Sequence, residues 1–203
     1  HINYLYDSSM IRKLTFCFKS IYNDFKEIDM KVSNEIINIC PEIKKWRHEL
    51  HAHPELGYEE EWTSNFVAEK LESFGLEIHR GMAKTGVVGV LKGANASLGG
   101  GGNKAIGLRA DMDALPMTEE NDFSYKSKFD GRMHACGHDG HTAMLLGAAK
   151  LLSSKKDFDG TVYFIFQPAE EGGGGGLAMI EDGLFQQFPM DSVWGYAQLA
   201  RYE

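Results

Sequence analysis

The feature that most restricts the fold of this chain is a strongly β-prone run, Thr161 to Phe166, with the composition of a buried strand. Gly160 and Pro168 flank this run and are expected to bound the strand on both sides. Other segments alternate between strand-like and helix-like patterns. Strands that alternate with helices predict an α/β fold in which a sheet is sandwiched by helices.

The other predicted elements follow from the spacing of apolar residues. One helix is predicted over about Glu61 to Phe74, with Gly75 as its left-handed stop, and another over Gly140 to Leu152. Lys31 to His51 also has helical spacing, but Pro41 is expected to divide it. Three strands and a short helix complete the prediction: Leu76 to His79, Val87 to Leu91, Ala105 to Asp111, and Leu177 to Asp182.

Composition excludes several classes of protein. A length of 203 residues with 43% hydrophobic content is enough to bury one core. The formal net charge of -8 and the scattered Lys and Arg residues argue against a nucleic-acid or anionic-membrane surface. The longest apolar runs fall far short of the roughly 20 residues of a membrane span. Three widely spaced cysteines form no disulfide framework, so we expect a reducing cytoplasm that keeps Cys136 available as a thiolate.

The two ends of the chain read differently from the middle. Residues 1–29 lack clean periodicity, and we expect a leader of upstream sequence, with Met30 as the genuine start; an ordinary N-terminal extension is the alternative. Gly93 to Asn103, with four consecutive glycines, is expected to be a flexible connection.

The run from His134 to His141 places five possible metal ligands within eight residues. Thiolate and imidazole suit divalent Zn, Co, Ni or Mn. Cys136 and His138 can reach a shared pair of ions, whereas His141 is as well suited to supporting a ligand. The alternative is a helix N-terminus with polar caps, in which Asp139 is the N-cap. Five such residues together favour a metal site.

Glu170 and Glu171 follow the buried strand directly and precede five glycines. Adjacent carboxylates repel each other unless a cation neutralises them, so one is expected to bind metal and its neighbour to act as general base. Gly172 to Gly176 would let backbone approach closely or would open the next helix. A solvated acidic turn is the alternative.

Asp111 and Asp113 lie at the end of another predicted strand. Both side chains can face one site only if the strand breaks there, and Pro116 supports a break. Because ligands in α/β folds gather beyond the carboxyl ends of strands, these aspartates, the His134–His141 run and the two glutamates are expected to converge. Cys136 could instead be the nucleophile of a cysteine hydrolase, although the free carboxylates suit metal-dependent hydrolysis better.

Four segments, in order and without large gaps, resemble the amidohydrolase branch of the M20 peptidase family, of hippurate-hydrolase and auxin-conjugate-hydrolase type. They are WRHELHAHPELGYEE (46–60), LRADMDALPMTEEND (108–122), MHACGHDGHTAMLLGAAKLL (133–152) and GTVYFIFQPAEEGGGGGLAMIEDGLF (160–185). The resemblance implies that residues 30–195 are the N-terminal part of a di-metal aminopeptidase-like catalytic domain. The lid domain, through which the parent enzyme would form a homo-oligomer, is absent from the chain.

The resemblance also implies residue roles. Cys136, His138 and Glu171 would bind two divalent metal ions (Mn, Zn, Co or Ni), Glu170 would be the general base, and Asp113 would support a ligand. The substrate would be a small N-acyl amino acid, with dipeptidase or aminoacylase activity as the alternative within the family. Three further motif residues look structural: Arg47, His51 and His53.

One departure from the family pattern concerns the end of the chain. The family continues with Gly-x-His-Asn-Trp-Pro, whose His is a ligand, but here Ala197 stands at that position and no His follows His141. We expect residues 196–203 to be an aberrant tail caused by a frameshift, and this chain alone to be inactive and poorly soluble because of exposed strand edge and apolar surface. A metal-binding pseudoenzyme or regulatory half-domain is the alternative.

Overall fold

A computed structural model describes residues 32–94 and 104–195 of the chain. The predicted leader over residues 1–29, the greater part of the predicted glycine-rich connection and the predicted tail over residues 196–203 lie outside these described residues. The chain divides into two compact units, His1–Ile37 and Asn38–Glu203. Of the first unit, residues 32–37 are described, and they include the first turn of helix α2 (Asn34–His51). The remaining description concerns the second unit.

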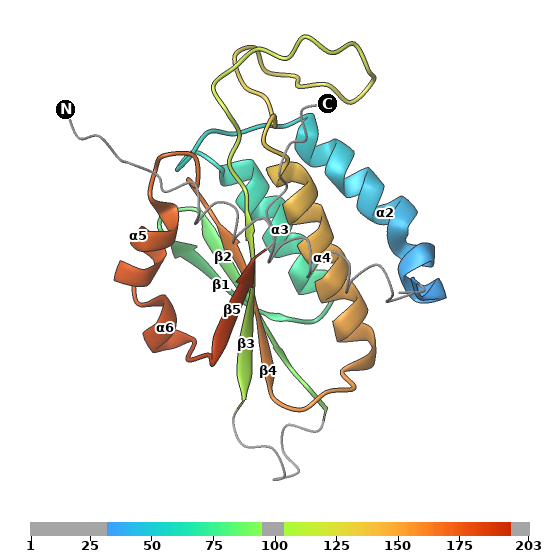
Figure 1. Ribbon diagram of the computed structural model, residues 1–203, viewed down its shortest axis with the longest axis vertical. Helices are drawn as coiled ribbons and strands as arrows, with labels where there is room; N and C mark the ends of the chain where they lie inside the picture. Colours follow the sequence, from blue (N-terminus) through green and yellow to red (C-terminus); the bar gives the residue numbers. More distant parts are fainter. Residues whose placement is uncertain (1–31, 95–103, 196–203) are drawn as a thin grey trace, which may run out of the picture. The chain divides into compact units, whose positions relative to one another are not determined.

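A five-stranded mixed sheet forms the centre of the second unit (Figure 1). Its strands are β1 (Glu77–Met82), β2 (Gly86–Lys92), β3 (Ala105–Asp111), β4 (Thr161–Gln167) and β5 (Ser192–Gly195). The strands lie in the order β1-β2-β4-β3-β5. The pairs β1–β2 and β2–β4 are antiparallel, whereas β3 runs parallel to both β4 and β5. All four predicted strands are therefore present with small differences at their ends, β1 beginning one residue later than predicted, whereas β5 was not predicted.

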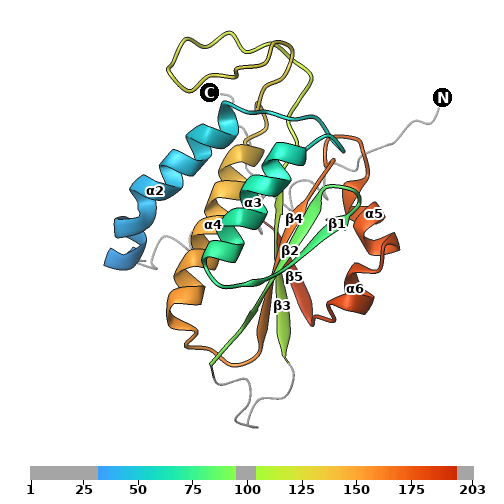
Figure 2. The same ribbon diagram turned by 180° about the vertical axis from the view of Figure 1, so that it is seen from behind.

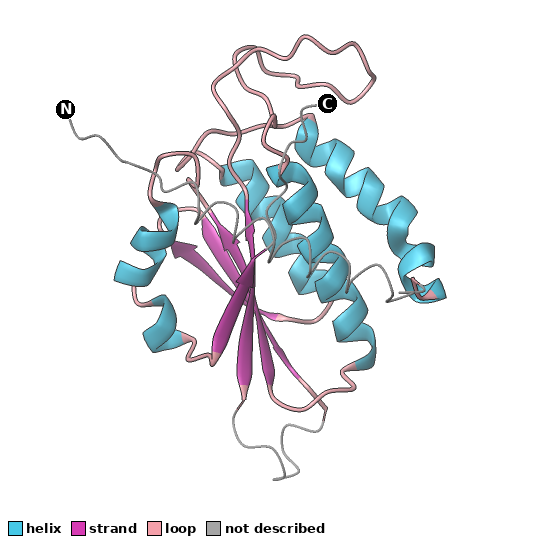
Figure 3. Ribbon diagram, in the orientation of Figure 1, coloured by secondary structure: helices cyan, strands magenta, loops and turns pink. Residues whose placement is uncertain are grey.

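Helices cover both faces of this sheet (Figures 1 and 2). Helices α3 (Glu61–Ser73) and α4 (His138–Lys155) lie on one face, and α5 (Gly175–Glu181) and α6 (Leu184–Gln187) lie on the other. Figure 3 shows the same layers coloured by secondary structure. The predicted α/β fold, a sheet sandwiched by helices, is confirmed. None of the helices in the described residues is both long and apolar enough to cross a membrane.

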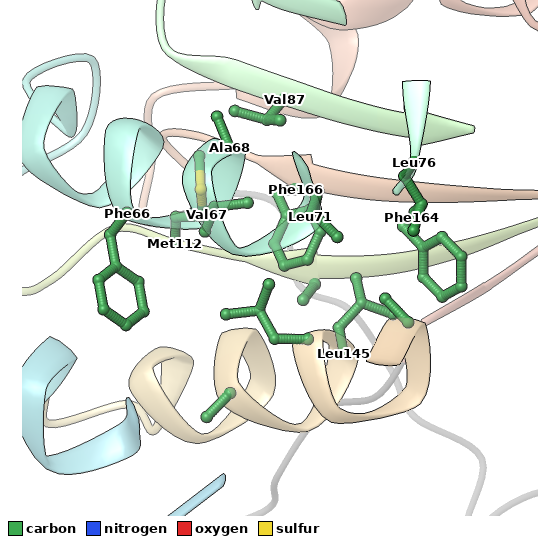
Figure 4. Close-up of a cluster of buried hydrophobic side chains, with 14 of the residues drawn as sticks. Phe66, Val67, Ala68, Leu71, Leu76, Val87, Met112, Leu145, Phe164 and Phe166 are labelled. Atoms are coloured by element: carbon green, nitrogen blue, oxygen red, sulfur yellow. The ribbon is translucent and has the colours of Figure 1, made fainter. Parts of the chain in front are cut away.

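The side chains of β4 explain why both faces must be covered. Phe164 and Phe166 are fully buried in the core under α3 and α4 (Figure 4), and Ile165 between them points into a second core under α5 and α6. Alternate residues of a strand point to opposite faces, so a strand that is apolar on both faces needs two layers of helices. Each large apolar side chain buried in this way contributes about 1.5–3 kcal/mol.

The predicted glycine stop ends α3, whereas the predicted proline break does not interrupt α2. Gly75 has a φ of +78°, and its N–H donates to the carbonyl oxygen of Glu72 while that of Leu76 donates to Leu71, so a left-handed stop ends α3 as predicted. The predicted division of the N-terminal segment at Pro41 is wrong, because α2 runs through it. Proline removes one helical hydrogen bond, and at an exposed position water can bond the freed carbonyl.

Strand β5 leaves apolar surface exposed at one side of the sheet. Among the described strands it pairs with β3 alone. Trp194 is 66% exposed and Val193 is 43% exposed. An exposed strand edge with apolar side chains is a site of association. The exposed strand edge and apolar side chains are the features from which we predict poor solubility, and poor solubility itself stays a prediction.

Candidate metal centre

The three segments that carry candidate ligands meet at one edge of the sheet, as predicted. Strands β3 and β4 are parallel and in register, with Asp111 opposite Gln167, so the residues that follow each strand emerge side by side. Helix α4 begins at this same edge, at the top of Figure 1, and its first residue is His138. The carboxyl ends of two parallel strands and the start of a helix therefore frame a single site.

Cys136, His138 and Glu171 come together at this edge. The Sγ atom, a ring nitrogen and a carboxylate oxygen of these three residues all lie within 4.8 Å of one another. The carboxylates of Glu170 and Glu171 each have an oxygen 3.8 Å from Nε2 of His138. The side chain of Glu170 is 42% exposed, so it also reaches solvent. The two glutamates are therefore part of the cluster and do not form a separate acidic turn.

The hydrogen bonds of His138 leave one ring nitrogen facing the cluster. Its Nδ1 lies 2.8 Å from the backbone oxygen of Asp113 and 3.2 Å from the Oδ1 atom of that residue, so Nδ1 carries the proton and donates. Nε2 is then the atom that can offer a lone pair to a cation, and it faces the carboxylates of Asp111 at 3.6 Å and of Glu170 and Glu171. A carboxylate that fixes a histidine tautomer in this way is the usual support of a metal-binding imidazole.

Asp113 also holds the turn that carries the two glutamates. Its Oδ2 atom accepts a hydrogen bond from the backbone N–H of Glu171 at 2.8 Å. Burial alone would raise the pKa of Asp113, but the bonds from His138 and from the backbone N–H groups of Glu171 and Glu170 outweigh burial and lower it. Asp113 is therefore ionised at neutral pH and connects the His138 side of the site to the glutamate side.

The surroundings of Cys136 fit a cation. Burial, followed by the neighbouring carboxylates of Glu171 and Glu170, raises the pKa of the Cys136 thiol to about 12. Divalent cations deprotonate coordinating thiols and neutralise clustered carboxylates, so this donor set of thiolate, imidazole and carboxylate fits Zn or a similar ion. The thiolate that we predicted for Cys136 thus depends on a cation. A cysteine nucleophile needs a lowered pKa, which is the opposite of what these neighbours produce.

Asp111 faces the same site from the end of β3. Its Oδ1 atom accepts from Nδ1 of His141 at 2.7 Å, and its Oδ2 atom accepts from Nη1 of Arg109 at 2.8 Å. The strand ends at Asp111, so Asp111 and Asp113 both turn towards the site, as the predicted break requires. Donor atoms of Asp111, His138 and His141 form a second group within 4.8 Å. His141 therefore borders the site through Asp111.

Comparison with known proteins agrees with this geometry. Residues 107–198 match the model of peptidase family M20/M25/M40. The hippurate hydrolase of Campylobacter jejuni is 53% identical over 167 residues, which is 82% of this chain and 42% of that protein.

The chain is similar to M20-family enzymes over about four fifths of its length. The N-acyl-L-amino acid amidohydrolase of Geobacillus stearothermophilus is 48% identical to it over 74% of the chain and 40% of that enzyme. A Bacillus subtilis structure described as a dinuclear metal-binding peptidase from the M20 family superimposes with a TM-score of 0.71 and 38% identity, over 78% of this chain and 43% of that one. The chain therefore spans about two fifths of the length of these relatives.

Asp139 does not have the role of N-cap that the alternative interpretation of this run gave it. The N-cap position of α4 is Gly137, and the Asp139 carboxylate instead accepts from Nε of Arg47 at 3.1 Å and from Nδ1 of His51 at 2.8 Å. The other ring nitrogen of His51 donates to Oε1 of Glu119 at 3.0 Å. We name the buried His51, Asp139 and Glu119 side chains the histidine clamp. Because both ring nitrogens face carboxylates, the clamp favours the imidazolium form of His51.

The histidine clamp joins three parts of the chain. His51 lies at the end of α2, Asp139 lies in the first turn of α4, and Glu119 lies in the loop between β3 and α4. Arg47 and His51 thus have the structural role expected for them, and His53 packs elsewhere, with its ring stacked on Trp62 at 4.3 Å. Sequence reasoning missed Glu119, because no local pattern distinguishes it from the other acidic residues of its loop.

The titration of buried histidines predicts how stability depends on pH. Burial disfavours the imidazolium of His51, but the bonds to Asp139 and Glu119 outweigh it and raise the pKa of His51 above the ordinary 6.5. Burial lowers the pKa of His134, whose ring nitrogens have no hydrogen-bond partner among the described residues, to about 4. The raised pKa of His51 stabilises the fold below pH 6.5, and this contribution is lost as pH rises. The lowered pKa of His134 costs stability as pH falls below 6.5.

We therefore expect the metal-free chain to be most stable near pH 6.5. Urea unfolding followed by circular dichroism between pH 5 and 8 measures this optimum. The raised pKa of His138 acts in the same direction as that of His51. A His51→Gln variant should lose part of the decline on the alkaline side while keeping the decline on the acid side. A stability that rises steadily from pH 6.5 to 8 would contradict the assignment of His51 as a buried cation.

Proposed function

We propose that the parent enzyme to which this chain corresponds hydrolyses the amide bond of N-acyl amino acids with two divalent metal ions (Mn, Zn, Co or Ni). Cys136, His138 and Glu171 would hold the ions in part, with Asp113 supporting His138. The observation that carries the proposal is the convergence of the three donor atoms within 4.8 Å, at a point where Nε2 of His138 faces the carboxylates.

When bound, such ions polarise a scissile carbonyl and lower the pKa of water. Glu170 would act as the general base: it lies beside the donor atoms, is not needed to orient His138, and has a side chain that is 42% exposed. It would accept the proton of the attacking water and return it to the leaving amine. Asp113 would keep the Nδ1 proton of His138 in place through its 2.8 Å and 3.2 Å contacts.

A pocket of about 360 Å³ adjoins the site and offers a place for the substrate. Asp113 and Glu171 form part of its wall, together with apolar side chains and glycine backbone that would suit an acyl group. The names of the relatives support an acylated amino acid: they include a hippurate hydrolase and an N-acyl-L-amino acid amidohydrolase. Relatives named thermostable carboxypeptidase favour a peptide substrate as the second candidate.

The chain by itself is proposed to be inactive. Two ions need more donors than Cys136, His138 and Glu171 supply, and the sequence contains no histidine after His141. Assembly of the parent enzyme into an oligomer through a lid domain, and a cytoplasmic location, are further parts of the proposal. The metal-binding pseudoenzyme remains the competing function for this chain.

A chimera tests the catalytic proposal. We would replace the matching segment of the Campylobacter jejuni hippurate hydrolase with residues 38–195 of this chain and assay hydrolysis of hippurate and other N-acyl amino acids. The 203-residue chain alone should show no turnover, whereas the metal-loaded chimera should hydrolyse at least one of these substrates. A folded, metal-loaded chimera without turnover on N-acyl amino acids or dipeptides would favour the pseudoenzyme.

Metal binding by the chain itself provides an independent prediction. Titration with Co²⁺ should give a thiolate-to-cobalt charge-transfer band, and Cys136→Ser should abolish the band and weaken binding by about 100-fold or more, since even supporting residues of metal sites cost 10–100-fold. Cys40→Ser is the matched control, because Cys40 is the other described free cysteine and lies in α2. A band that persists in Cys136→Ser would refute the ligand assignment.

A further inference from the structure

Glu60 is a buried carboxylate with no evident local task. It occupies the N-cap position of α3, yet its side chain makes no capping bond. The carboxylate of Glu55 instead accepts from the backbone N–H groups of Trp62 and Thr63, at 3.0 and 2.8 Å. Glu60 itself is fully buried, and burial raises its pKa. Burying a carboxylate is costly unless its oxygens are bonded.

Both oxygens of Glu60 are bonded, and one reaches the turn that carries the proposed base. Oε2 accepts from the hydroxyl of Thr85 at 2.7 Å. Oε1 accepts from the backbone N–H of Ala169 at 2.8 Å, a residue 109 positions further along the chain. Ala169 directly precedes Glu170 and Glu171. The buried carboxylate therefore connects the start of α3 to the end of β4.

Ala169 has a backbone conformation that its surroundings must enforce. Its φ is +49°, in the left-handed region that an L-residue other than glycine rarely adopts. Two glycines pack against it: a Cβ atom on Gly57 would lie 3.0 Å from the Cβ of Ala169, and one on Gly173 would lie 2.7 Å from it. The Ala169 carbonyl accepts from the N–H of Gly175 at 3.0 Å. The turn is thus fixed by close packing, which the glycine run permits as predicted.

Two buried carboxylates bracket Glu170 along the backbone. Glu60 accepts the N–H on its N-terminal side, from Ala169, and Asp113 accepts the N–H on its C-terminal side, from Glu171. The backbone N–H groups of the two residues that flank Glu170 are therefore each held at 2.8 Å, by acceptors from two different segments. Loss of either acceptor would free the turn to relax towards an ordinary φ at Ala169.

We propose that Glu60 is a positioning residue that acts through Ala169 to aim Glu170 and Glu171 at the metal site. The inference rests on the proposed function and deepens it. It assigns the task of directing the Glu170 and Glu171 carboxylates to a residue outside the donor cluster. A glutamine at position 60 can do the same task, because its amide oxygen accepts from Ala169 and its amide nitrogen donates to Thr85. An apolar residue of similar size cannot.

The test compares Glu60→Gln and Glu60→Met in the full 203-residue chain, with Co²⁺ alone as the probe. Glu60→Gln should bind Co²⁺ within about threefold of the unmodified chain, whereas Glu60→Met should bind at least about tenfold more weakly, as for other supporting residues of metal sites. Glu55→Met is the matched control: it removes a carboxylate that holds the N-terminus of α3 and should leave affinity unchanged. Amide exchange at Ala169, measured by NMR without metal, should be slow in Glu60→Gln and fast in Glu60→Met.

The outcomes separate this inference from the proposed function. An unmodified chain that binds no Co²⁺ overturns the proposed function, and the amide exchange of Ala169 still tests whether Glu60 holds the turn. Co²⁺ binding that is equal in Glu60→Met and in the unmodified chain overturns the positioning role alone. Weak Co²⁺ binding in Glu60→Gln as well would mean that the negative charge of Glu60 supports binding, and would also overturn the positioning role. If Glu60→Met does not fold, Thr85→Val replaces it, with about three- to tenfold weaker binding expected and unchanged binding contradicting the inference.

Discussion

Replacement of Asp139 by alanine is expected to lower the free energy of unfolding by about 3–5 kcal/mol, because it removes one partner of a buried ion pair and leaves the other charged. His51 and Asp139 have side chains only 5% and 0% exposed, and their atoms lie 2.8 Å apart. The imidazolium of His51 would keep one acceptor, Glu119, and lose the other. Urea unfolding near pH 6.5 measures the change.

An exposed pair of the same type is the control for Asp139. Glu77 accepts from Nε2 of His79 at 3.0 Å, but these side chains are 62% and 40% exposed, so Glu77→Ala should change the free energy of unfolding by less than about 0.5 kcal/mol. The contrast isolates burial as the cause, since both pairs join a histidine to a carboxylate. Equal effects of the two substitutions would mean that the histidine clamp adds no more than a surface ion pair.

The fold was predictable from sequence where local pattern and tertiary packing agree. Strand β4 was recognised because its apolar run has no solvent-facing side, and Gly75 was recognised because only glycine adopts its φ of +78° without strain. Pro41 misled the prediction of α2. The residues that hold this helix in the core follow the proline, at Trp46 and Leu50, so packing compensates for one missing hydrogen bond.

The candidate site was predictable only in the residues that a short motif brings together. Cys136 and His138 are two positions apart, and two adjacent glutamates are visible in the sequence as a candidate ligand and base. Other buried contacts join distant segments: Asp139, which the sequence offered as an N-cap only in the alternative interpretation, bonds His51 88 positions away, and Glu60 reaches Ala169 over 109 positions. Sequence spacing carries no signal for such contacts, because burial selects them only once the chain has folded.

The two adjacent glutamates should separate in function although they look alike in geometry. Each has a carboxylate oxygen 3.8 Å from Nε2 of His138, so distance alone does not distinguish a ligand from a base. Their surroundings do differ. Glu171 belongs to the group of three donors and its backbone is held by Asp113, whereas the Glu170 side chain is the more exposed, 42% against 28%. A ligand needs to be fixed, and a base needs access to water.

Glu171→Gln is therefore expected to weaken Co²⁺ binding by the chain by about 100-fold or more, and Glu170→Gln by less than about threefold, by comparison with supporting residues of metal sites. In the chimera with the hippurate hydrolase, Glu170→Gln should instead lower turnover by about 10²–10⁴-fold, the usual contribution of a general base, with metal content unchanged. The reverse pattern, in which Glu170→Gln loses the metal and Glu171→Gln keeps it, would exchange the two roles. Equal loss of metal in both variants would mean that the carboxylates act as ligands together, and the base would then have to come from elsewhere in the site.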